Sequence, residues 1–99
     1  MKSLLIAAAA VASMAFAGAA QAQEALAKEK GCLGCHAVDT KKVGPAYKEV
    51  AAKYKGKADA EATIVGMLKS GKAASGKTHM QPKASEDEMK SLAKWVLSL

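Results

Sequence analysis

The clearest pattern of hydrophobic and polar positions lies at the C-terminal end of the chain. Apolar residues recur there three and four positions apart, at Met89, Leu92, Ala93, Val96 and Leu97. This spacing predicts an amphipathic helix with one buried stripe. The preceding segment, Ser85-Glu86-Asp87-Glu88, matches the S-x-x-E capping box, so we expect Ser85 to cap the helix. Trp95 lies off the stripe and is expected to cover a crevice or pack on a neighbouring helix.

Three shorter segments also have helical patterns. Residues 24–31 are rich in helix formers, and we expect this helix to continue into the cysteines that follow, with Leu26 as its apolar contact. Residues 45–54 begin with a proline, which suits a first helical turn, and carry apolar residues at helical spacing. Residues 60–70 are expected to form the third helix, with Asp59 as its cap and Gly71 at its end.

Two polar segments separate these helices. Residues 37–44 predict a surface loop, and residues 71–83 predict a longer one that contains two glycines, a proline and three lysines. A loop of that length in so small a domain is usually functional. Nothing after residue 22 alternates like a strand, so the predicted fold class is all-α.

The chain opens with a segment of another kind. Met1-Lys2-Ser3 precedes an uncharged, alanine-rich run from Leu4 to Ala20, and Ala20-Gln21-Ala22 matches the A-x-A cleavage rule. We therefore predict a secretory signal peptide over residues 1–22, cleaved after Ala22, and a single domain over residues 23–99. The apolar run is just long enough to span a bilayer, so an uncleaved membrane anchor is the alternative.

The charge of the predicted domain favours one class of partner. Residues 23–99 contain 14 lysines, no arginine and 9 acidic residues, which gives a formal charge of +5. Binders of single-stranded nucleic acid need aromatic residues interleaved with the lysines, and this chain lacks that pattern. We interpret the charge as steering towards an acidic protein partner. The candidate rim lysines are Lys41, Lys42, Lys72, Lys77 and Lys83.

Candidate chemistry is concentrated in the stretch Cys32-Leu33-Gly34-Cys35-His36. This is the C-x-x-C-H pattern of a c-type haem attachment site. On a helical turn the two cysteines point to one side, and His36, four residues after Cys32, returns to that side. Both sulfurs could then reach the vinyl groups of one porphyrin while the imidazole binds the iron. The porphyrin would also supply the interior that 77 residues barely provide, so the chain without it should be close to unfolded.

Other sites that contain C-x-x-C are less compatible with this sequence. A zinc ribbon needs a second pair of cysteines, and a zinc finger needs two later histidines, of which only His79 is present. A thioredoxin-like dithiol follows a strand, whereas the residues before Cys32 predict a helix. A structural disulfide between Cys32 and Cys35 is the last alternative.

His36 leaves the opposite side of the iron open. The candidates for this position are Met67, Met80, Met89 and His79. Met67 and Met89 belong to helical apolar stripes, where methionine usually fills the core. Met80 lies in the long polar loop, where binding iron best explains an apolar side chain, and the adjacent His79 is its rival. A thioether opposite an imidazole raises the reduction potential and closes the site, as in an electron carrier.

Together with Met80, two segments, Lys30-Gly-Cys-Leu-Gly-Cys-His36 and Lys42-Val-Gly-Pro-Ala-Tyr47, resemble the short bacterial class I cytochromes c of the c-551/c-552 type. The resemblance covers residues 23–99. It implies an all-α fold of about four short helices around one haem c, held by two thioethers. It also implies terminal helices that cross beside the haem, a methionine loop on its other side, and a Pro45 carbonyl that accepts a hydrogen bond from His36.

The sequence departs from that family at two points. The family often has Pro-Met-Pro-Pro around the axial methionine, whereas this chain has His79-Met80-Gln81-Pro82, and the tryptophan common in the preceding loop is missing. These changes bear on the rigidity of the loop and on the reduction potential.

We therefore predict a periplasmic, monomeric electron carrier that transfers one electron between respiratory partners. It is not expected to be an enzyme, to bind nucleic acid or to stay inserted in a membrane after cleavage. The alternative is a haem-based ligand-binding protein or weak peroxidase with an open or labile sixth iron position.

Overall fold

A computed structural model describes residues 21–99 of the chain, so the predicted signal peptide lies outside the described residues except for Gln21 and Ala22. The described part is helical, as predicted, and its only strand-like feature is an isolated β-bridge between Lys72 and Thr78. Its elements are a helix over residues 21–29, the short 3₁₀ helix η1 (Cys32–Gly34), α2 (Tyr47–Tyr54), α3 (Ala60–Ser70) and α4 (Glu86–Leu97). None of the helices within residues 21–99 has the length and apolar character needed to cross a bilayer.

The boundaries of the first two predicted helices are wrong: the first was expected over residues 24–31 and is found over residues 21–29, and the second starts two residues late. The first helix does not continue into the cysteines, because Gly31 adopts a left-handed backbone with φ of 83° that separates it from η1. The second begins at Tyr47 rather than at Pro45, because Ala46 is extended, with φ −60° and ψ 141°. This extended stretch leaves the Pro45 carbonyl free to accept a hydrogen bond from a side chain, as described below.

One of the two predicted helix caps forms its hydrogen bonds, and the other does not. The Ser85 capping box is confirmed, since Ser85 Oγ accepts from the Glu88 amide at 3.1 Å and Glu88 Oε1 accepts from the Ser85 amide at 2.9 Å. Asp59 occupies the N-cap position of α3, but its side chain makes no capping hydrogen bond. Its backbone, with φ −97° and ψ 10°, lacks the extended conformation that directs a capping side chain towards the first turn.

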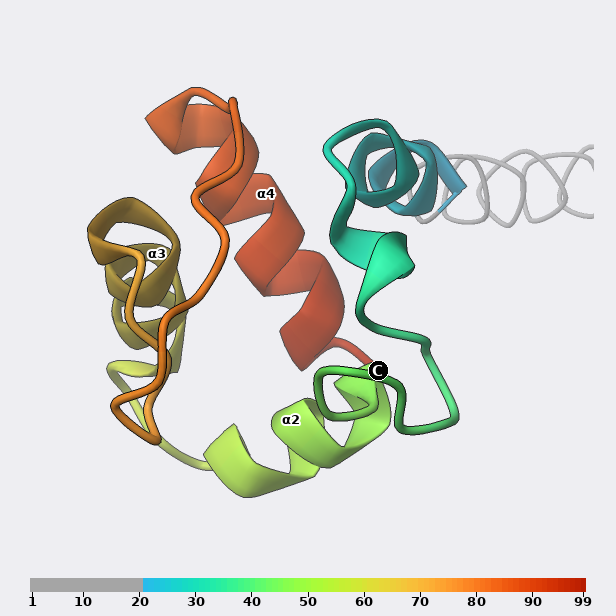
Figure 1. The fold of residues 1–99 in the computed structure, drawn as a ribbon. Coiled ribbons are helices and arrows are strands. Elements are labelled where there is room, and N and C mark those ends of the chain that lie inside the picture. Colours follow the sequence, from blue (N-terminus) through green and yellow to red (C-terminus); the bar gives the residue numbers. More distant parts are fainter. Residues whose placement is uncertain (1–20) are drawn as a thin grey trace, which may run out of the picture.

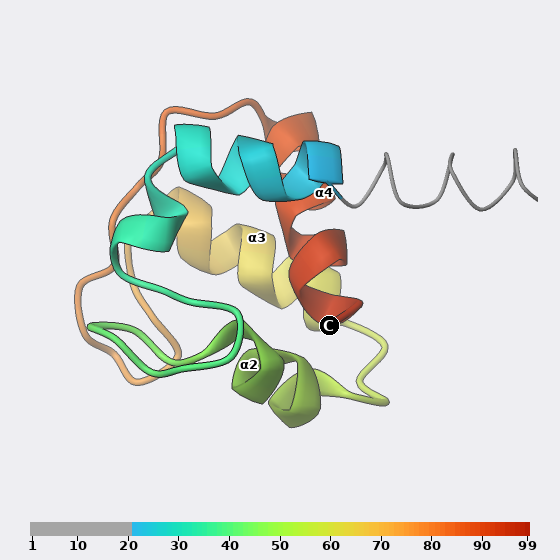
Figure 2. The same ribbon diagram turned by 90° about the vertical axis from the view of Figure 1, so that its right-hand side faces the viewer.

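Helix α4 lies in the middle of the fold and supplies residues to two core clusters (Figures 1 and 2). The first cluster joins α2, α3 and α4 and consists of Tyr54, Ala60, Ile64, Val65, Met89 and Ala93. The second joins the first helix, α2 and α4 and consists of Ala27, Tyr47, Leu92, Trp95 and Val96. Four residues of the predicted α4 stripe are therefore buried, and the fifth, Leu97, is partly buried against the first cluster.

The first helix crosses α4, as the family resemblance implied (Figures 1 and 2). Ala27 is fully buried at this crossing, where its small side chain allows the two helices to approach closely. Leu26 packs on the same cluster, and Lys30 lies 3.6 Å from the carboxylate of Glu88 in the first turn of α4. Trp95 packs edge-on against Tyr47, with ring centroids 5.6 Å apart.

Residues 71–83 form the predicted long loop, which is closed by a hydrogen bond within the loop and tied to the end of α3 by another. The His79 amide donates to Gly71 O at 2.7 Å, and Gln81 Nε2 donates to Lys69 O at 2.7 Å. Between these anchors the chain makes a tight turn, in which the Ala73 amide donates to Lys77 O at 2.8 Å. The loop is thus folded back on the end of α3.

Candidate haem-binding site

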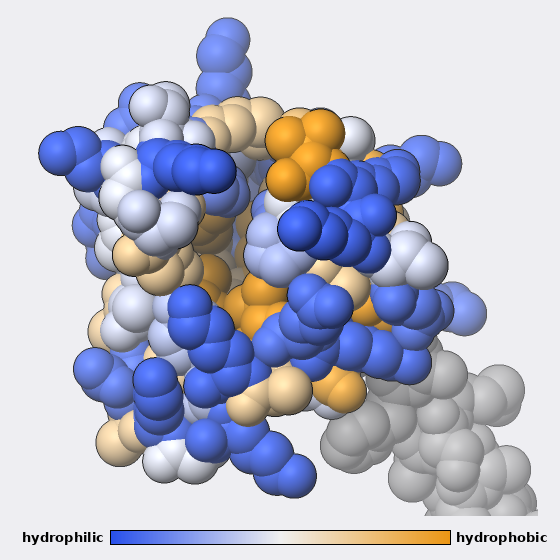
Figure 3. All heavy atoms as spheres, turned by 60° about the horizontal axis from the view of Figure 1, so that its bottom comes forward, coloured by the Kyte–Doolittle hydropathy of each residue, from blue (hydrophilic) through white to orange (hydrophobic). Residues whose placement is uncertain are grey.

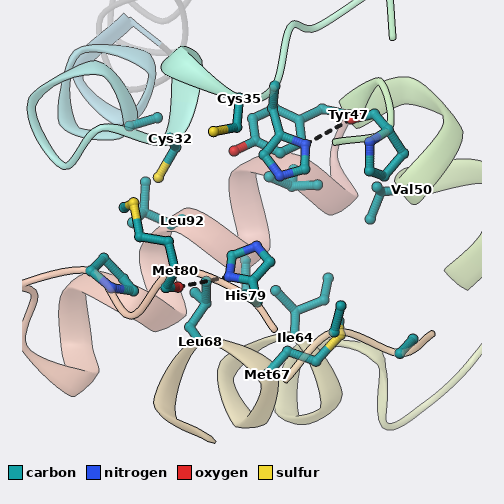
Figure 4. Close-up of a pocket in the computed structure, with 18 of the residues that line it drawn as sticks. Cys32, Cys35, Tyr47, Val50, Ile64, Met67, Leu68, His79, Met80 and Leu92 are labelled. Carbon is teal, nitrogen blue, oxygen red and sulfur yellow. Dashed lines mark hydrogen bonds between the residues drawn. The ribbon is translucent and has the colours of Figure 1, made fainter. Parts of the chain in front are cut away.

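A cavity of about 420 Å³ opens between the motif that contains the cysteines and the long loop. Hydrophobic residues reach the surface in the hollow between hydrophilic side chains (Figure 3). The lining is contributed by every helix and by the loop (Figure 4). The apolar residues of its floor include Ala27, Val50, Ile64, Leu68, Leu92, Ala93 and Val96. A volume of this size lies within the range of about 300–1,000 Å³ that is typical of ligand sites.

His36 lines one wall of the cavity, just after η1. Its amide donates to Cys32 O at 3.0 Å, which closes a helical turn across the motif. Its ring nitrogen Nδ1 lies 2.7 Å from Pro45 O. Because a carbonyl can only accept, Nδ1 carries the proton and Nε2 keeps its lone pair. His36 is thereby prepared to bind a metal through Nε2.

Gly44 lies directly against the His36 ring. A Cβ atom at residue 44 would overlap with Cε1 and lie 2.7 Å from Nδ1 and 2.8 Å from Nε2 of that ring. The Gly44 amide also donates to Cys35 O at 2.7 Å, so the backbone and the ring are held together. Glycine is required at this position by the close approach, a role that the sequence analysis did not assign to it.

Tyr47 also contacts His36, a role that the sequence analysis did not assign to it, although it belongs to the segment that carries the family resemblance. The Tyr47 ring stacks on the His36 ring with centroids 4.7 Å apart and planes 18° apart, and it also packs against Trp95. Burial, followed by the nearby Cys32 thiol, raises the pKa of the Tyr47 hydroxyl far above its usual value. Helical spacing predicts that Tyr47 is buried but not which side chain it touches.

Both cysteines line the cavity as free thiols, Cys32 half-buried and Cys35 exposed (Figure 4). Burial raises the pKa of the Cys32 thiol, with a smaller opposing contribution from the Tyr47 hydroxyl. Dithiol redox sites instead lower the pKa of their nucleophilic cysteine. Within residues 21–99, no group of three or more His, Cys, Asp and Glu side chains is placed to hold a metal ion. This part of the chain therefore gives no support to the zinc alternative.

The candidates for the second iron ligand separate into two groups. Met89 is buried in the core and does not line the cavity, whereas Met67, His79 and Met80 line it (Figure 4). Met80 is 46% exposed, and its sulfur lies 4.0 Å from the place where a Cβ of Gly31 would be. The His79 ring faces the His36 ring across the cavity, with centroids 6.1 Å apart.

The five lysines predicted to form a rim are all exposed, and none of them lines the cavity. Lys42 Nζ donates to Leu33 O at 3.2 Å, which holds this side chain beside the cysteine motif. Lys53, which the sequence analysis did not select, is the lysine that lines the cavity. Val43, next to Lys42, is 84% exposed.

Comparison with known proteins adds independent evidence. The family model described as Cytochrome c matches residues 19–99. The chain is 54% identical over 81 residues to cytochrome c-551 of Pseudomonas aeruginosa, which covers 80% of this chain and 78% of that protein. It is 41% identical over 102 residues to cytochrome c-552 of Nitrosomonas europaea, which covers 100% of this chain and 99% of that protein.

The chain belongs to the cytochrome c family. Its fold is that of the class I cytochromes c, because the crystal structure of Nitrosomonas europaea cytochrome c552 matches with a TM-score of 0.70 at 39% identity, covering 77% of this chain and 98% of that one. A class 1 cytochrome from Sideroxydans lithotrophicus matches with a TM-score of 0.66 at 44% identity, covering 79% and 92%. This cytochrome c therefore binds one haem c covalently through two thioethers and carries electrons.

The cavity of this cytochrome c suits a haem by its own chemistry. Two thiols and an imidazole with an available Nε2 line one wall, and an apolar floor faces them. The thioethers of Met67 and Met80 and a second imidazole, that of His79, line it as well. These are the ligand types that proteins use for haem iron and its covalent attachment.

Proposed function

We propose that this cytochrome c is a periplasmic one-electron carrier whose haem is attached through Cys32 and Cys35 and whose iron is bound by His36 and Met80. When bound, the haem supplies the redox chemistry by cycling between the ferric and ferrous states. The observation that carries the proposal is the wall formed by residues 32–47, which presents both thiols and the Nε2 of His36 to one apolar cavity.

The role of His36 is supported by how completely its ring is fixed. Pro45 O sets the tautomer through a 2.7 Å hydrogen bond, Tyr47 covers one ring face, and Gly44 lies directly against the ring. A hydrogen bond from the other ring nitrogen to a carbonyl is the usual arrangement for a metal-bound histidine, and it makes the imidazole a better donor. Pro45 thus acts as a positioning residue for His36.

The role of Met80 is supported by its place in the loop. It is an apolar residue that lines the cavity on the side of the long loop, and the cavity-lining alternative Met67 also packs against the core of α2, α3 and α4. A thioether opposite an imidazole gives the raised potential and closed site that an electron carrier needs.

Delivery to the periplasm is proposed from the sequence of residues 1–22, which has the features of a cleaved signal peptide. Covalent haem attachment accords with that location, since a bound cofactor cannot be lost after export. The mass of the secreted protein should equal residues 23–99 plus one haem. A mass that includes residues 1–22 would contradict cleavage and favour a membrane anchor.

Electron transfer is proposed to occur through an exposed haem edge, with no substrate transformed, to respiratory partners with acidic docking surfaces. The positive charge of residues 23–99 should attract anions and repel cations over about one Debye length, about 8–10 Å at ordinary salt. Oxidation of the ferrous protein by ferricyanide, an anion, should therefore slow as ionic strength rises. Oxidation by a cationic cobalt complex should accelerate instead. Rates that stay flat with both reagents would contradict electrostatic steering.

The departure of residues 79–82 from the Pro-Met-Pro-Pro pattern of the family favours one second candidate, a haem-based ligand-binding protein or weak peroxidase. A weakly held thioether would leave the sixth iron position accessible to small ligands. Carbon monoxide added to the ferrous protein distinguishes the two functions. The absorption spectrum of a carrier with a closed site should not change at low carbon monoxide concentration, whereas that of a ligand-binding protein should shift at once.

A further inference from the structure

Two histidines on opposite walls of the cavity each have a backbone carbonyl close to Nδ1. His36 Nδ1 lies 2.7 Å from Pro45 O, and His79 Nδ1 lies 2.7 Å from Met80 O (Figure 4). Both acceptors are carbonyls, so in both rings Nδ1 carries the proton and Nε2 keeps its lone pair. No described residue forms a hydrogen bond with either Nε2. This is the arrangement that metal-binding histidines usually adopt.

The separation of the two rings matches that of two ligands on one metal ion. Their centroids lie 6.1 Å apart, and their planes are 30° apart. Two imidazoles bound through Nε2 on opposite sides of one metal at about 2.0 Å have centroids roughly 6 Å apart. The cavity therefore already contains a pair of imidazoles with the spacing of axial ligands.

The backbone around His79 holds the ring in place. The His79 amide donates to Gly71 O at 2.7 Å, and Gln81, two residues later, donates its side-chain amide to Lys69 O at 2.7 Å. The half-buried His79 ring lies near the His36 ring, whereas the side chain of Met80 lies beside Gly31. Of the two neighbouring residues, the imidazole is the one that the protein itself orients towards His36.

We propose that His79 is a second ligand for the iron position assigned to Met80: when the thioether leaves, the His79 imidazole binds opposite His36. In this exchange the iron–sulfur bond breaks, the iron–Nε2 bond forms, and no proton or electron is transferred. The inference rests on the proposed function, because it presupposes haem iron bound by His36. Its consequence is that the site stays closed to external ligands even when Met80 is displaced, at a lower reduction potential.

The test compares the haem-loaded Met80→Ala variant with the Met80→Ala/His79→Ala double variant. The ferric single variant should lack the methionine-to-iron band and remain low-spin, with two nitrogen ligands in its electron paramagnetic resonance spectrum. The double variant should be high-spin. If His79 occupies the iron in about nine-tenths of the single-variant molecules, external imidazole should bind it about tenfold more weakly than it binds the double variant.

Three further measurements make the outcome decisive. The His79→Ala variant alone should keep the methionine band, which shows that residue 79 is not needed for folding. A high-spin Met80→Ala variant would overturn the proposal. So would a double variant that remains low-spin, because another side chain, such as a loop lysine, would then be the ligand. The wild-type spectrum tests Met80 separately: without a methionine band, the His36/Met80 assignment fails, and the two variants still decide the role of His79.

Discussion

The two walls of the haem cavity are built in different ways. In the wall of residues 32–47, the single candidate ligand His36 is fixed by a hydrogen bond, by a stacked aromatic ring and by a glycine backbone against its ring. The opposite wall is the loop 71–83, which is closed by a main-chain hydrogen bond, is tied to α3 by a side-chain amide and presents two adjacent candidates, His79 and Met80. Packing therefore determines the ligand on one side, whereas on the other side it leaves a choice to be made by the chemistry of the iron.

The largest effect is expected when the haem that joins the two walls is removed. Covering roughly 500 Å² of porphyrin contributes roughly 12 kcal/mol of gross apolar stabilisation, as much as the net stability of many domains, which is about 5–15 kcal/mol. The Cys32→Ala/Cys35→Ala variant should therefore lose most of its helical signal in far-ultraviolet circular dichroism. Wild-type protein produced without haem should behave in the same way. A double variant that lacks haem and still folds cooperatively would contradict this.

The next effect tests the rigid wall. Gly44→Ala places a methyl group against the His36 ring, so either the ring or the backbone must shift. Overpacking of this kind costs about 1–3 kcal/mol. The matched control is Gly66→Ala in α3, where a new Cβ meets no atom within 4 Å and where alanine should stabilise the helix by up to about 1 kcal/mol. Urea denaturation of the haem-loaded proteins measures the stability of both variants. If Gly44→Ala were as stable as the wild type, the close approach of Gly44 to His36 would not matter.

A smaller effect is expected in the loop wall. Gln81→Ala removes the hydrogen bond to Lys69 O, which costs about 1 kcal/mol. Because this bond holds the loop next to Met80, the variant should also bind external imidazole faster than the wild type does. Lys77→Ala, at an exposed position of the same loop, is the control and should change neither property. If Gln81→Ala lowers stability but leaves imidazole binding unchanged, the loop is not what limits access.

The smallest effect is the difference in stability between the variants of two helix caps, Ser85 of α4 and Asp59 of α3. Ser85→Ala removes an observed capping hydrogen bond and should cost about 1 kcal/mol, whereas Asp59→Ala removes none and should cost less. Thermal unfolding measures the difference, and an equal loss in both variants would contradict it.

The hydrogen bond from the Ser85 amide also lowers the pKa of Glu88. The ionised Glu88 carboxylate therefore contributes to the stability of the folded protein at neutral pH, and this contribution is lost as the pH falls below the ordinary glutamate pKa of about 4.3. Glu88→Gln should remove this dependence.

The same difference between the walls explains what the sequence could predict. The α4 stripe, the Ser85 cap and the bounds of α3 follow from local spacing and turn chemistry, and all three are confirmed. The motif with Cys32, Cys35 and His36 also carries its chemistry in local spacing. The contacts of Gly44 and Tyr47 with the His36 ring come from chain segments that meet only in the folded protein, so no pattern reveals them.

The choice between His79 and Met80 could not be made from local sequence for a different reason. Both residues are in one loop, and the side chains that line the cavity around them come from all the helices. Spacing predicted a functional loop with Met80 in it but not the orientation of the His79 ring towards His36. The late start of α2 has a similar origin, since the extended backbone at Ala46 accompanies the tertiary hydrogen bond to Pro45.

The most direct test of the account is the absorption spectrum of the purified, haem-loaded wild-type protein. A carrier with iron between His36 and Met80 should show a low-spin ferric spectrum with a methionine-to-iron charge-transfer band at the red end, and its ferrous spectrum should not respond to carbon monoxide. A high-spin ferric spectrum without that band, together with a ferrous form that binds carbon monoxide at once, would contradict it.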